Sequence, residues 1–392
     1  MLPDILASRR TFLKKIALAV GMLAMPSFMT GCASFRRIFR PADMAWEIWP
    51  LEKKIGQMLI PGFPGSSISE NSPVASHIRD YGAGGVVLFD NNPLLQVTDR
   101  NITSPDQLSE LTGELHRLAS TPLFIAVDQE GGTVARLKES CGFPPSVSAK
   151  KLGLINELSI TESEADRIAV TLSSHGINLN LAPVVDLELN PENPVIAGKE
   201  RSFSADPLQV AAHAERFIKA HHRHNVATCL KHFPGHGSSR SDSHAGLVDV
   251  TDVWSEAELV PYSRLISAGL CDMVMTAHIF NRNIDPEYPA TLSKATIDGI
   301  LRKRLLFDGL VISDDLYMGA IARNFSYETA VERAINAGVD MLIIANDKVY
   351  EPFIIPRTID LIMKKVSSGV IKEERINEAC RRIISLKRRY LL

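Results

Sequence analysis

The sequence lacks several features that would assign it to a specialised class of protein. Its 43 basic and 45 acidic residues nearly balance, with a formal net charge of −2, so it has no long basic surface of the kind that binds a phosphate backbone. The apolar segment 16–29 has about 14 residues, too few to cross a bilayer. We therefore expect no nucleic acid as a partner.

Cysteine is also scarce. The chain has five, and two of them, Cys229 and Cys271, lie in or beside apolar runs, where a free thiol packs as a small hydrophobe. What the sequence does have is bulk, because 45% of its 392 residues are hydrophobic, enough to bury one large core. We expect one main domain and a monomer.

Residues 1–31 have the pattern of an export signal. Arg9 and Arg10, followed by Phe12 and Leu13, resemble a twin-arginine signal, and the short apolar segment after them suits its hydrophobic region. Twin-arginine substrates fold before export, in a reducing compartment. We therefore predict a signal peptide over 1–31 and no structural disulfide.

The segment that follows resembles a lipoprotein anchor. Small residues precede Cys32, so we predict cleavage before Cys32, lipidation of that cysteine, and an anchor and linker over 32–48. The expected location is the periplasmic side of the cell envelope, on a membrane. The alternative is a signal peptide cut nearby, with Cys32 discarded or inert. With the anchor in place, three arginines of the linker could rest on anionic lipid: Arg36, Arg37 and Arg40.

Short apolar runs rich in β-forming residues alternate with helical periodicity through the rest of the chain. The alternation is typical of parallel crossover units, and eight units predict a single (β/α)8 TIM-like barrel over 49–392. A doubly wound open sheet is the structural alternative. The eight runs are 56–60, 85–89, 123–127, 177–182, 226–230, 273–277, 309–313 and 341–345. Helical periodicity marks 165–175, 210–222, 292–305 and 327–337, and closing helices are expected over 350–392.

Polar side chains follow several of these runs at the point where each run ends. Asp128 follows the third run, Lys231 and His232 the fifth, His278 the sixth and Asp314 the seventh. The carboxyl ends of parallel barrel strands meet at one rim, where barrel enzymes carry their active sites. The positions predict an enzyme with its chemistry at that rim.

Several separated motifs carry a resemblance to a known family. Taken in this order, they resemble glycoside hydrolase family 3, in its β-N-acetylglucosaminidase branch, over most of the chain after the signal. The motifs are Asp128-Gln129-Glu130-Gly131-Gly132 with Arg136, residues 190–196 leading into Glu200-Arg201-Ser202-Phe203, the loop 231–244, Pro289-Ala290-Thr291-Leu292-Ser293, and Ile312-Ser313-Asp314-Asp315-Leu316.

Asp314 is the expected nucleophile. A carboxylate fixed at a strand end can attack an anomeric carbon and form a covalent glycosyl-enzyme, and the resemblance implies the same role for the first aspartate of the pair. Asp315 points elsewhere on an extended backbone, so we expect it to be structural or a hydrogen-bond acceptor. The structural alternative is that Asp314 forms the N-cap of the next helix.

His244 is the expected general acid/base, since the resemblance implies a histidine in place of the usual second carboxylic acid. Asp242, two residues before it, can accept the proton of the other ring nitrogen and stabilise the imidazolium. A metal set of His232, His236, Asp242 and His244 is the alternative. Pro234 and Gly235 break the helical spacing of such a set, so we expect no metal and no cofactor.

Five charged residues are expected to bind the sugar. Charged groups at strand ends suit a substrate with many hydroxyls, and the resemblance maps these positions onto those that hold N-acetylglucosamine. A structural ion pair is the alternative for the two arginines. Glu130 and His278 are expected to support the site without belonging to it. The five residues are Asp128, Arg136, Arg201, Lys231 and His232.

The sequence departs from the family pattern in the loop after the fifth run. Ser238 and Ser239 stand where an acidic residue and a threonine are common, and Val248 stands where a proline is common. These changes bear on the loop and on preference for the leaving group more than on the reaction itself.

The expected activity is that of an exported, retaining β-N-acetylglucosaminidase. Its substrates would be peptidoglycan fragments or chitin oligosaccharides with a terminal N-acetylglucosamine. A phosphorylase is one alternative, because a neutral histidine repels phosphate less than a carboxylate does. A substrate-assisted hexosaminidase is a second. A catalytically inactive, glycan-binding envelope lipoprotein is a third, from a different class of protein.

Overall fold

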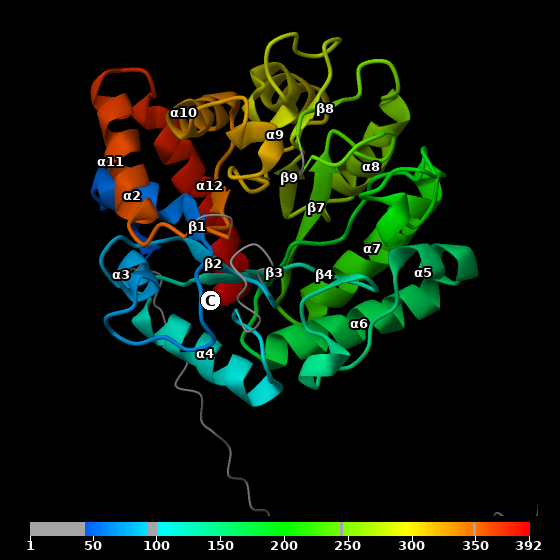
Figure 1. The fold of residues 1–392 in the computed structure, drawn as a ribbon, viewed down its shortest axis with the longest axis horizontal. Helices are drawn as coiled ribbons and strands as arrows, with labels where there is room; N and C mark the ends of the chain where they lie inside the picture. The colour runs from blue at the N-terminus through cyan, green and yellow to red at the C-terminus, as the bar shows by residue number, and fades with distance from the viewer. Residues whose placement is uncertain (1–43, 92–99, 244–245, 348–349) are drawn as a thin grey trace, which may run out of the picture. The chain divides into compact units, whose positions relative to one another are not determined.

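Short parallel strands at the centre of the molecule alternate with helices around them (Figure 1). The computed structural model describes residues 44–91, 100–243, 246–347 and 350–392, which all belong to one compact unit. Six strands form one parallel sheet in the order β11-β9-β7-β6-β3-β2. Their bounds are β2 (Gly85–Leu88), β3 (Phe124–Val127), β6 (Leu179–Asn180), β7 (Ala227–Phe233), β9 (Met273–Thr276) and β11 (Leu310–Ser313).

The remaining two of the eight expected strands pair with each other. β1 (Leu59–Pro61) and β12 (Leu342–Ile344) form a parallel pair, which meets the six-stranded sheet through single bridges, Gly62 with Val87 and Ile312 with Met341. On their other sides, β1 meets β2 and β12 meets β11 through these single bridges only, without a continuous ladder. The alternation of eight parallel strands with helices is therefore confirmed, but the expectation of one continuous eight-stranded barrel sheet is wrong.

The helices follow the strands and cover the outside of the sheet (Figure 1). Side-chain caps fix several of their starts: the Ser104 hydroxyl accepts from Gln107 N at 3.2 Å, and the Asp206 carboxylate accepts from Leu208 N at 2.9 Å. The helices are α2 (Leu51–Gln57), α3 (Pro73–Arg79), α4 (Pro105–Leu118), α5 (Ala149–Ile155), α6 (Leu158–Ser174), α7 (Pro207–Arg223), α8 (Val260–Ser267), α9 (Gly319–Ala322), α10 (Tyr327–Ala337), α11 (Ile354–Ser367) and α12 (Glu373–Leu391).

Shorter turns of 3-10 helix and one π-helix complete the described chain. The stretch expected as an ordinary helix over 292–305 is instead the π-helix η7 (Ala295–Arg304), whose wider turn the sequence periodicity does not distinguish. The 3-10 turns are η2 (Trp46–Ile48), η3 (Glu139–Cys141), η4 (Ala197–Lys199), η5 (Glu256–Leu259) and η6 (Ala290–Leu292). Within the described residues, no helix is long and apolar enough to span a membrane.

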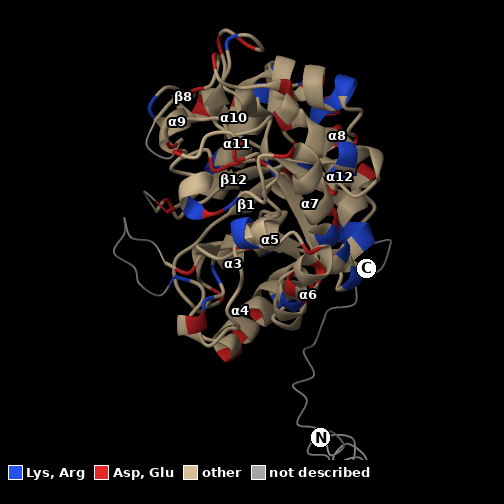
Figure 2. Ribbon diagram, turned by 90° about the vertical axis from the view of Figure 1, so that its right-hand side faces the viewer, with Lys and Arg blue, Asp and Glu red and all other residues tan. Residues whose placement is uncertain are grey.

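Small elements added at the carboxyl ends of the strands build the rim. β4 (Gln129–Gly131) and β5 (Val134–Ala135) form a hairpin after β3, and β8 (Val248–Asp249) pairs with β10 (Ile279–Phe280) beyond β7 and β9. In Figure 2, β8 and α9 lie on the left and the C-terminus lies on the right. The rim and the end of α12 are therefore at opposite sides of the molecule.

Candidate active site

A buried lysine joins two carboxylates at the rim. Lys231, near the end of β7, places its Nζ 2.6 Å from Asp128 Oδ1 and 2.7 Å from Glu130 Oε1. Burial alone would lower the pKa of Lys231, but the two carboxylates raise it. The lysine is therefore a fixed positive charge at the rim, joined to two carboxylates that follow β3.

Arg201 reaches the same glutamate from the long connection after β6. Its Nε and Nη2 donate to Glu130 Oε2 and Oε1 at 2.8 and 2.7 Å, a two-pronged contact that fixes both groups. Burial alone would raise the pKa of Glu130, but Arg201 and Lys231 lower it to about 2. Glu130, expected only to support the site, is its central acceptor.

Arg136 completes this charged group from the β4–β5 hairpin. Its Nη2 lies 3.4 Å from Asp128 Oδ2 and its Nη1 lies 3.4 Å from Asp90 Oδ1. Burial alone would raise the pKa of Asp128, but Lys231 and Arg136 hold it far below the usual range. Both arginines thus form the ion pairs that were the alternative interpretation, and both do so at the rim.

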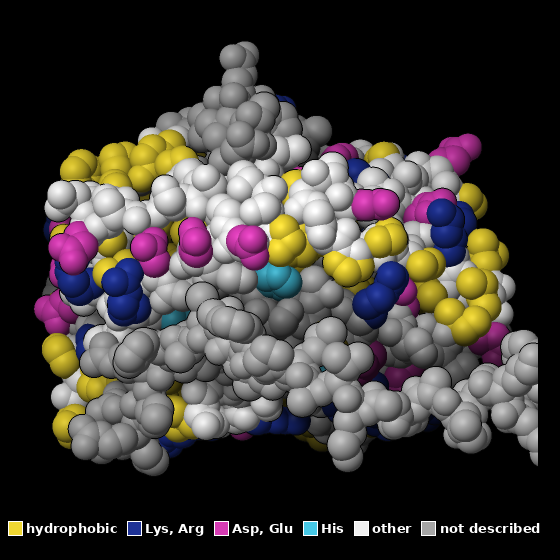
Figure 3. All heavy atoms as spheres, turned by 90° about the horizontal axis from the view of Figure 1, so that it is seen from below, with side chains coloured by type: hydrophobic (Ala, Val, Ile, Leu, Met, Phe, Trp, Pro, Cys, Tyr) yellow, Lys and Arg dark blue, Asp and Glu magenta, His cyan; other side chains and the backbone are white. Residues whose placement is uncertain are grey.

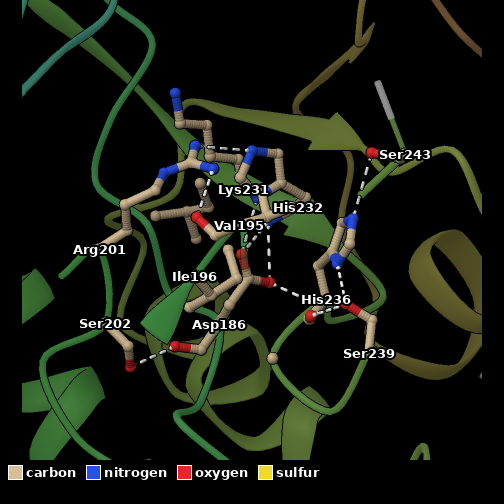
Figure 4. A network of polar contacts seen from close by, with 12 residues as sticks. Asp186, Val195, Ile196, Arg201, Ser202, Lys231, His232, His236, Ser239 and Ser243 are labelled. Atoms are coloured by element: carbon tan, nitrogen blue, oxygen red, sulfur yellow. Dashed lines mark hydrogen bonds and ion pairs between the residues drawn. The ribbon is translucent and has the colours of Figure 1, made fainter. Parts of the chain in front are cut away.

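Asp186 is a buried hub that the sequence analysis missed (Figure 4). Its carboxylate accepts from the backbone N of His232 at 3.1 Å and of His236 at 2.8 Å, and it lies 2.7 Å from His232 Nδ1. His232 Nε2 lies 3.1 Å from Arg201 Nη2, which can only donate. The ring proton of His232 is therefore on Nδ1, donated to Asp186.

His236 holds the loop that follows β7. Its Nδ1 lies 2.7 Å from Ser239 Oγ and its Nε2 lies 3.2 Å from Ser243 Oγ (Figure 4). Burial lowers the pKa of His236 to about 4, so the ring is neutral near pH 7. Gly237 next to it is required by space, because a Cβ there would lie 1.6 Å from the Leu187 carbonyl oxygen.

The two aspartates after β11 point to different neighbours. Asp314 is half-buried, its backbone N donates to Thr276 O at 3.4 Å, and its Oδ1 accepts from Asp315 N at 2.8 Å. Asp315 is buried and accepts from Ala345 N at 2.8 Å. Burial and the nearby Asp347 raise the pKa of Asp315 to about 7. The geometry agrees with a structural Asp315 beside a more accessible Asp314.

His278 follows β9 and contacts the backbone of the aspartate pair that follows β11. Its Nδ1 lies 2.8 Å from Thr291 Oγ1, and its Nε2 lies 2.9 Å from the Asp315 carbonyl oxygen. The imidazole is buried, and Thr291 belongs to the motif 289–293. His278 therefore supports the backbone of Asp315.

The expected acid/base dyad is described only in part. Asp242 is half-buried in the loop after β7, whereas His244 lies outside the described residues, as does Cys32. Ser243, between the two dyad residues, accepts from Ala320 N at 3.1 Å through its carbonyl oxygen. This bond joins the loop to α9, which follows Asp314 in the chain.

The rim therefore brings together most of the residues expected at the site. Asp128, Arg136, Arg201, Lys231 and His232 form one connected set with Glu130. Asp314 lies two strands away, because Ser313 pairs with Thr276 and Thr276 with Phe233. Among the described residues, no group of three His, Cys, Asp or Glu is arranged to hold a metal ion. Such a rim can bind a polyhydroxylated ring and present a carboxylate to it.

Comparisons with known proteins point to one family. The model for "Glycosyl hydrolase family 3 N terminal domain" matches residues 50–386. A protein named "Beta-hexosaminidase" from Tolumonas auensis is 36% identical over 274 residues, which are 69% of this chain and 78% of that protein.

Solved structures agree. A glycoside hydrolase family 3 β-N-acetylglucosaminidase from Paenibacillus has a TM-score of 0.80 and 33% identity, and covers 88% of this chain. The match spans 63% of that longer protein, less than two thirds. A β-N-acetylhexosaminidase from Beutenbergia cavernae has a TM-score of 0.76 and 28% identity, over 86% of this chain and 98% of its own.

Proposed function

Because the chain belongs to glycosyl hydrolase family 3, and is therefore a glycoside hydrolase, we propose that it removes terminal β-linked N-acetylglucosamine from the non-reducing end of glycans. The observation that carries the proposal is the connected set of Lys231, Asp128, Glu130 and Arg201 at the rim. Relatives of the chain are named for β-hexosaminidase and β-N-acetylglucosaminidase activity.

The charged set supports binding of a single sugar ring. Its carboxylates accept hydrogen bonds from hydroxyl groups, and Lys231, Arg201 and Arg136 donate them. The groups already hold one another through ion pairs, so little side-chain freedom is lost when a sugar binds. Tight binding of the first sugar can then align its anomeric carbon with Asp314.

The proposed reaction is a double displacement. The Asp314 carboxylate bonds to the anomeric carbon as the glycosidic C–O bond breaks, and His244, assisted by Asp242, gives its proton to the leaving oxygen. In the second step the neutral His244 takes a proton from water, and the water oxygen displaces Asp314. The sugar leaves with retained configuration, and both residues return to their starting states.

The proposed setting is the cell envelope. The predicted twin-arginine signal and the predicted lipidation of Cys32 support a location on the periplasmic side of a membrane, with peptidoglycan fragments or chitin oligosaccharides as the proposed substrates. A monomer suffices, since every residue of the proposed mechanism comes from one chain.

The direct test is release of 4-nitrophenol from its β-N-acetylglucosaminide. The chain starting at Ala33 should cleave this substrate, and it should cleave the matching β-glucoside far more slowly. Asp314→Ala should lose about a thousandfold or more of the activity, which corresponds to an increase of about 4 kcal/mol in the activation barrier. Cleavage of neither substrate, with or without phosphate, would leave a glycan-binding protein as the better account. Turnover that depends on phosphate would identify a phosphorylase instead.

A further inference from the structure

The face opposite the rim combines exposed apolar residues with exposed arginines. It is named here the amino-end face, because α12 lies across the amino ends of the strands: Arg375 near its start meets Asp340, just before β12, and Tyr390 near its end meets Asp272, just before β9. Figure 2 shows this end of α12 on the right with blue ribbon around it, and β8 and α9 on the left. The residues that define the face are Ile48, Leu306, Arg381, Arg388, Arg389 and Leu392.

The apolar members of the face are unusually open to solvent. Ile48 is 84% exposed, Leu306 is 78% exposed and Leu392 is 54% exposed. Trp46 and Trp49, on either side of Ile48, pack only part of their rings against the small cluster around Ile384. Tryptophans beside exposed aliphatic residues are typical of segments that lie at a membrane–water interface.

Arginines outnumber the aspartates that they meet on this side. Asp308 faces both Arg381 and Arg382, at 3.4 and 3.2 Å. Asp340 faces Arg382 at 3.3 Å and also Arg302 and Arg375. Glu378 also meets Arg375 and Asp272 meets Arg389, so the positive charge that is left over lies near the exposed Arg381 and Arg388 of α12.

Two hollows of about 500 Å³ open among these residues. One is lined by Arg389, His224 and Leu392, with other residues. The other is lined by Leu306 and four basic residues, together with three acidic ones: Lys294, Arg302, Arg375 and Arg382, and Asp298, Asp308 and Glu378. Arginines beside apolar side chains suit the phosphate headgroups of anionic lipids. Figure 3 offers a contrast, because acidic side chains form a row across the face seen there.

The chain also enters the folded unit at this face. Arg388 Nη2 donates to the Met44 carbonyl oxygen at 2.9 Å, and Met44 packs against Cys380 and Ile384 of α12. Only the linker between Cys32 and Met44 separates this point from the proposed lipid, a reach of at most roughly 40 Å. A linker that short keeps the amino-end face near the bilayer.

We propose that the amino-end face docks against an anionic phospholipid bilayer and turns the rim toward glycans outside it. Exposed apolar side chains enter the interface while the arginines meet lipid phosphates. The proposal goes beyond the reaction, and it takes from the proposed function only the anchoring at Cys32. Its test does not depend on lipidation, because the unlipidated chain should show the same preference.

The experiment uses the chain starting at Ala33, which retains the whole compact unit. It should sediment with vesicles of phosphatidylglycerol and phosphatidylcholine, and not with phosphatidylcholine alone. Raised salt should weaken the binding. The double variant Arg381→Glu with Arg388→Glu should bind at least about tenfold more weakly, and Ile48→Ser should also weaken binding.

A matched control reverses two charges elsewhere. Arg282→Glu with Arg323→Glu changes the net charge equally, at exposed residues that follow β10 and α9 on the rim side, and should bind as the parent does. Every variant should retain cleavage of the chromogenic glycoside, which shows that it is folded. If the parent chain itself does not cleave the glycoside, that result counts against the proposed reaction only, and the result of the vesicle experiment still stands.

Tryptophan fluorescence identifies the docked face. The chain has three tryptophans, and Trp254 lies on the rim side, where its Nε1 donates to Pro234 O at 3.2 Å. Brominated lipids should quench Trp46 and Trp49 in a Trp254→Phe variant as strongly as in the parent. Binding that survives the Arg381 and Arg388 reversals, quenching of Trp254 alone, or no preference for anionic vesicles would each overturn the proposal.

Discussion

Lys231 and Glu130 form a buried ion pair, with 2.7 Å between Nζ and Oε1. Each partner also binds a second group of opposite charge, Lys231 to Asp128 and Glu130 to Arg201. Two cations and two carboxylates therefore balance in a set drawn from three segments of the chain. Because these four groups hold one another through ion pairs, their side chains are fixed in position at the rim.

Glu130→Gln should weaken both folding and substrate binding. The change leaves Lys231 and Arg201 with one carboxylate fewer in a buried place, where loss of a charged partner costs about 3–5 kcal/mol of unfolding free energy. KM for the chromogenic glycoside should rise. Urea unfolding and steady-state kinetics measure the two effects.

The matched control for that change is Glu188→Gln. Glu188 also pairs with a lysine at 2.7 Å, but Lys150 and Glu188 are partly exposed. A loss of about 1 kcal/mol or less is expected there. Equal losses in the two variants would contradict the central place given to Glu130.

The two aspartates after β11 should respond oppositely to the same substitution. Asp314→Asn should lose about a thousandfold or more of kcat/KM, which corresponds to an increase of about 4 kcal/mol in the activation barrier. The reason is that an amide cannot form the covalent intermediate. Asp315→Asn should retain most activity, since an amide oxygen can still accept from Ala345 N. Comparable losses of kcat/KM in both variants would remove the distinction between nucleophile and support.

Glu258 should make the protein less stable as pH rises through its titration. Its carboxyl is buried beneath the loop and accepts from Gly237 N at 2.9 Å and Ser238 Oγ at 2.6 Å. Burial raises the pKa of Glu258 to about 7, from an ordinary 4.5. Between these values the folded state binds more protons, so the contribution is full below about pH 4.5 and is lost toward pH 7.

Glu258→Gln tests that sign. The variant lacks this titration, so its unfolding free energy relative to the parent should increase between pH 5 and pH 8, by up to about 1.4 kcal/mol per pH unit. Urea unfolding at a series of pH values measures the difference. A constant difference across that range would show that the carboxyl titrates normally.

Lys387 should have the opposite effect on the pH dependence of stability. It lies buried on α12, donates to Gln57 Oε1 at 2.7 Å, and burial lowers its pKa to about 7. The unfolded chain binds the extra proton between pH 7 and 10.5, so this group adds stability as pH rises through that window. Lys387→Met should lack the slope, whereas the exposed Lys303→Met should keep it. Parallel slopes in parent and Lys387→Met would contradict this.

Local sequence predicted the eight strands because each apolar run is short, β-rich and followed by a polar residue. It could not predict that β1 and β12 meet the sheet through single bridges, because the pairing of segments distant in sequence depends on tertiary packing. Asp186 was missed because it lies four residues beyond the run 177–182, with no motif to mark it. Glu258 contacts the loop from η5, and only folding brings those segments together.

The most direct test of the mechanism is covalent trapping. The chain starting at Ala33 is incubated with an activated 2-fluoro sugar, digested and analysed by mass spectrometry. A sugar adduct on the peptide that contains Asp314, absent from Asp314→Asn, is the predicted result. Turnover of the chromogenic glycoside with no adduct, or an adduct on another carboxylate, would contradict Asp314 as the nucleophile and favour attack by the substrate's own acetamido group.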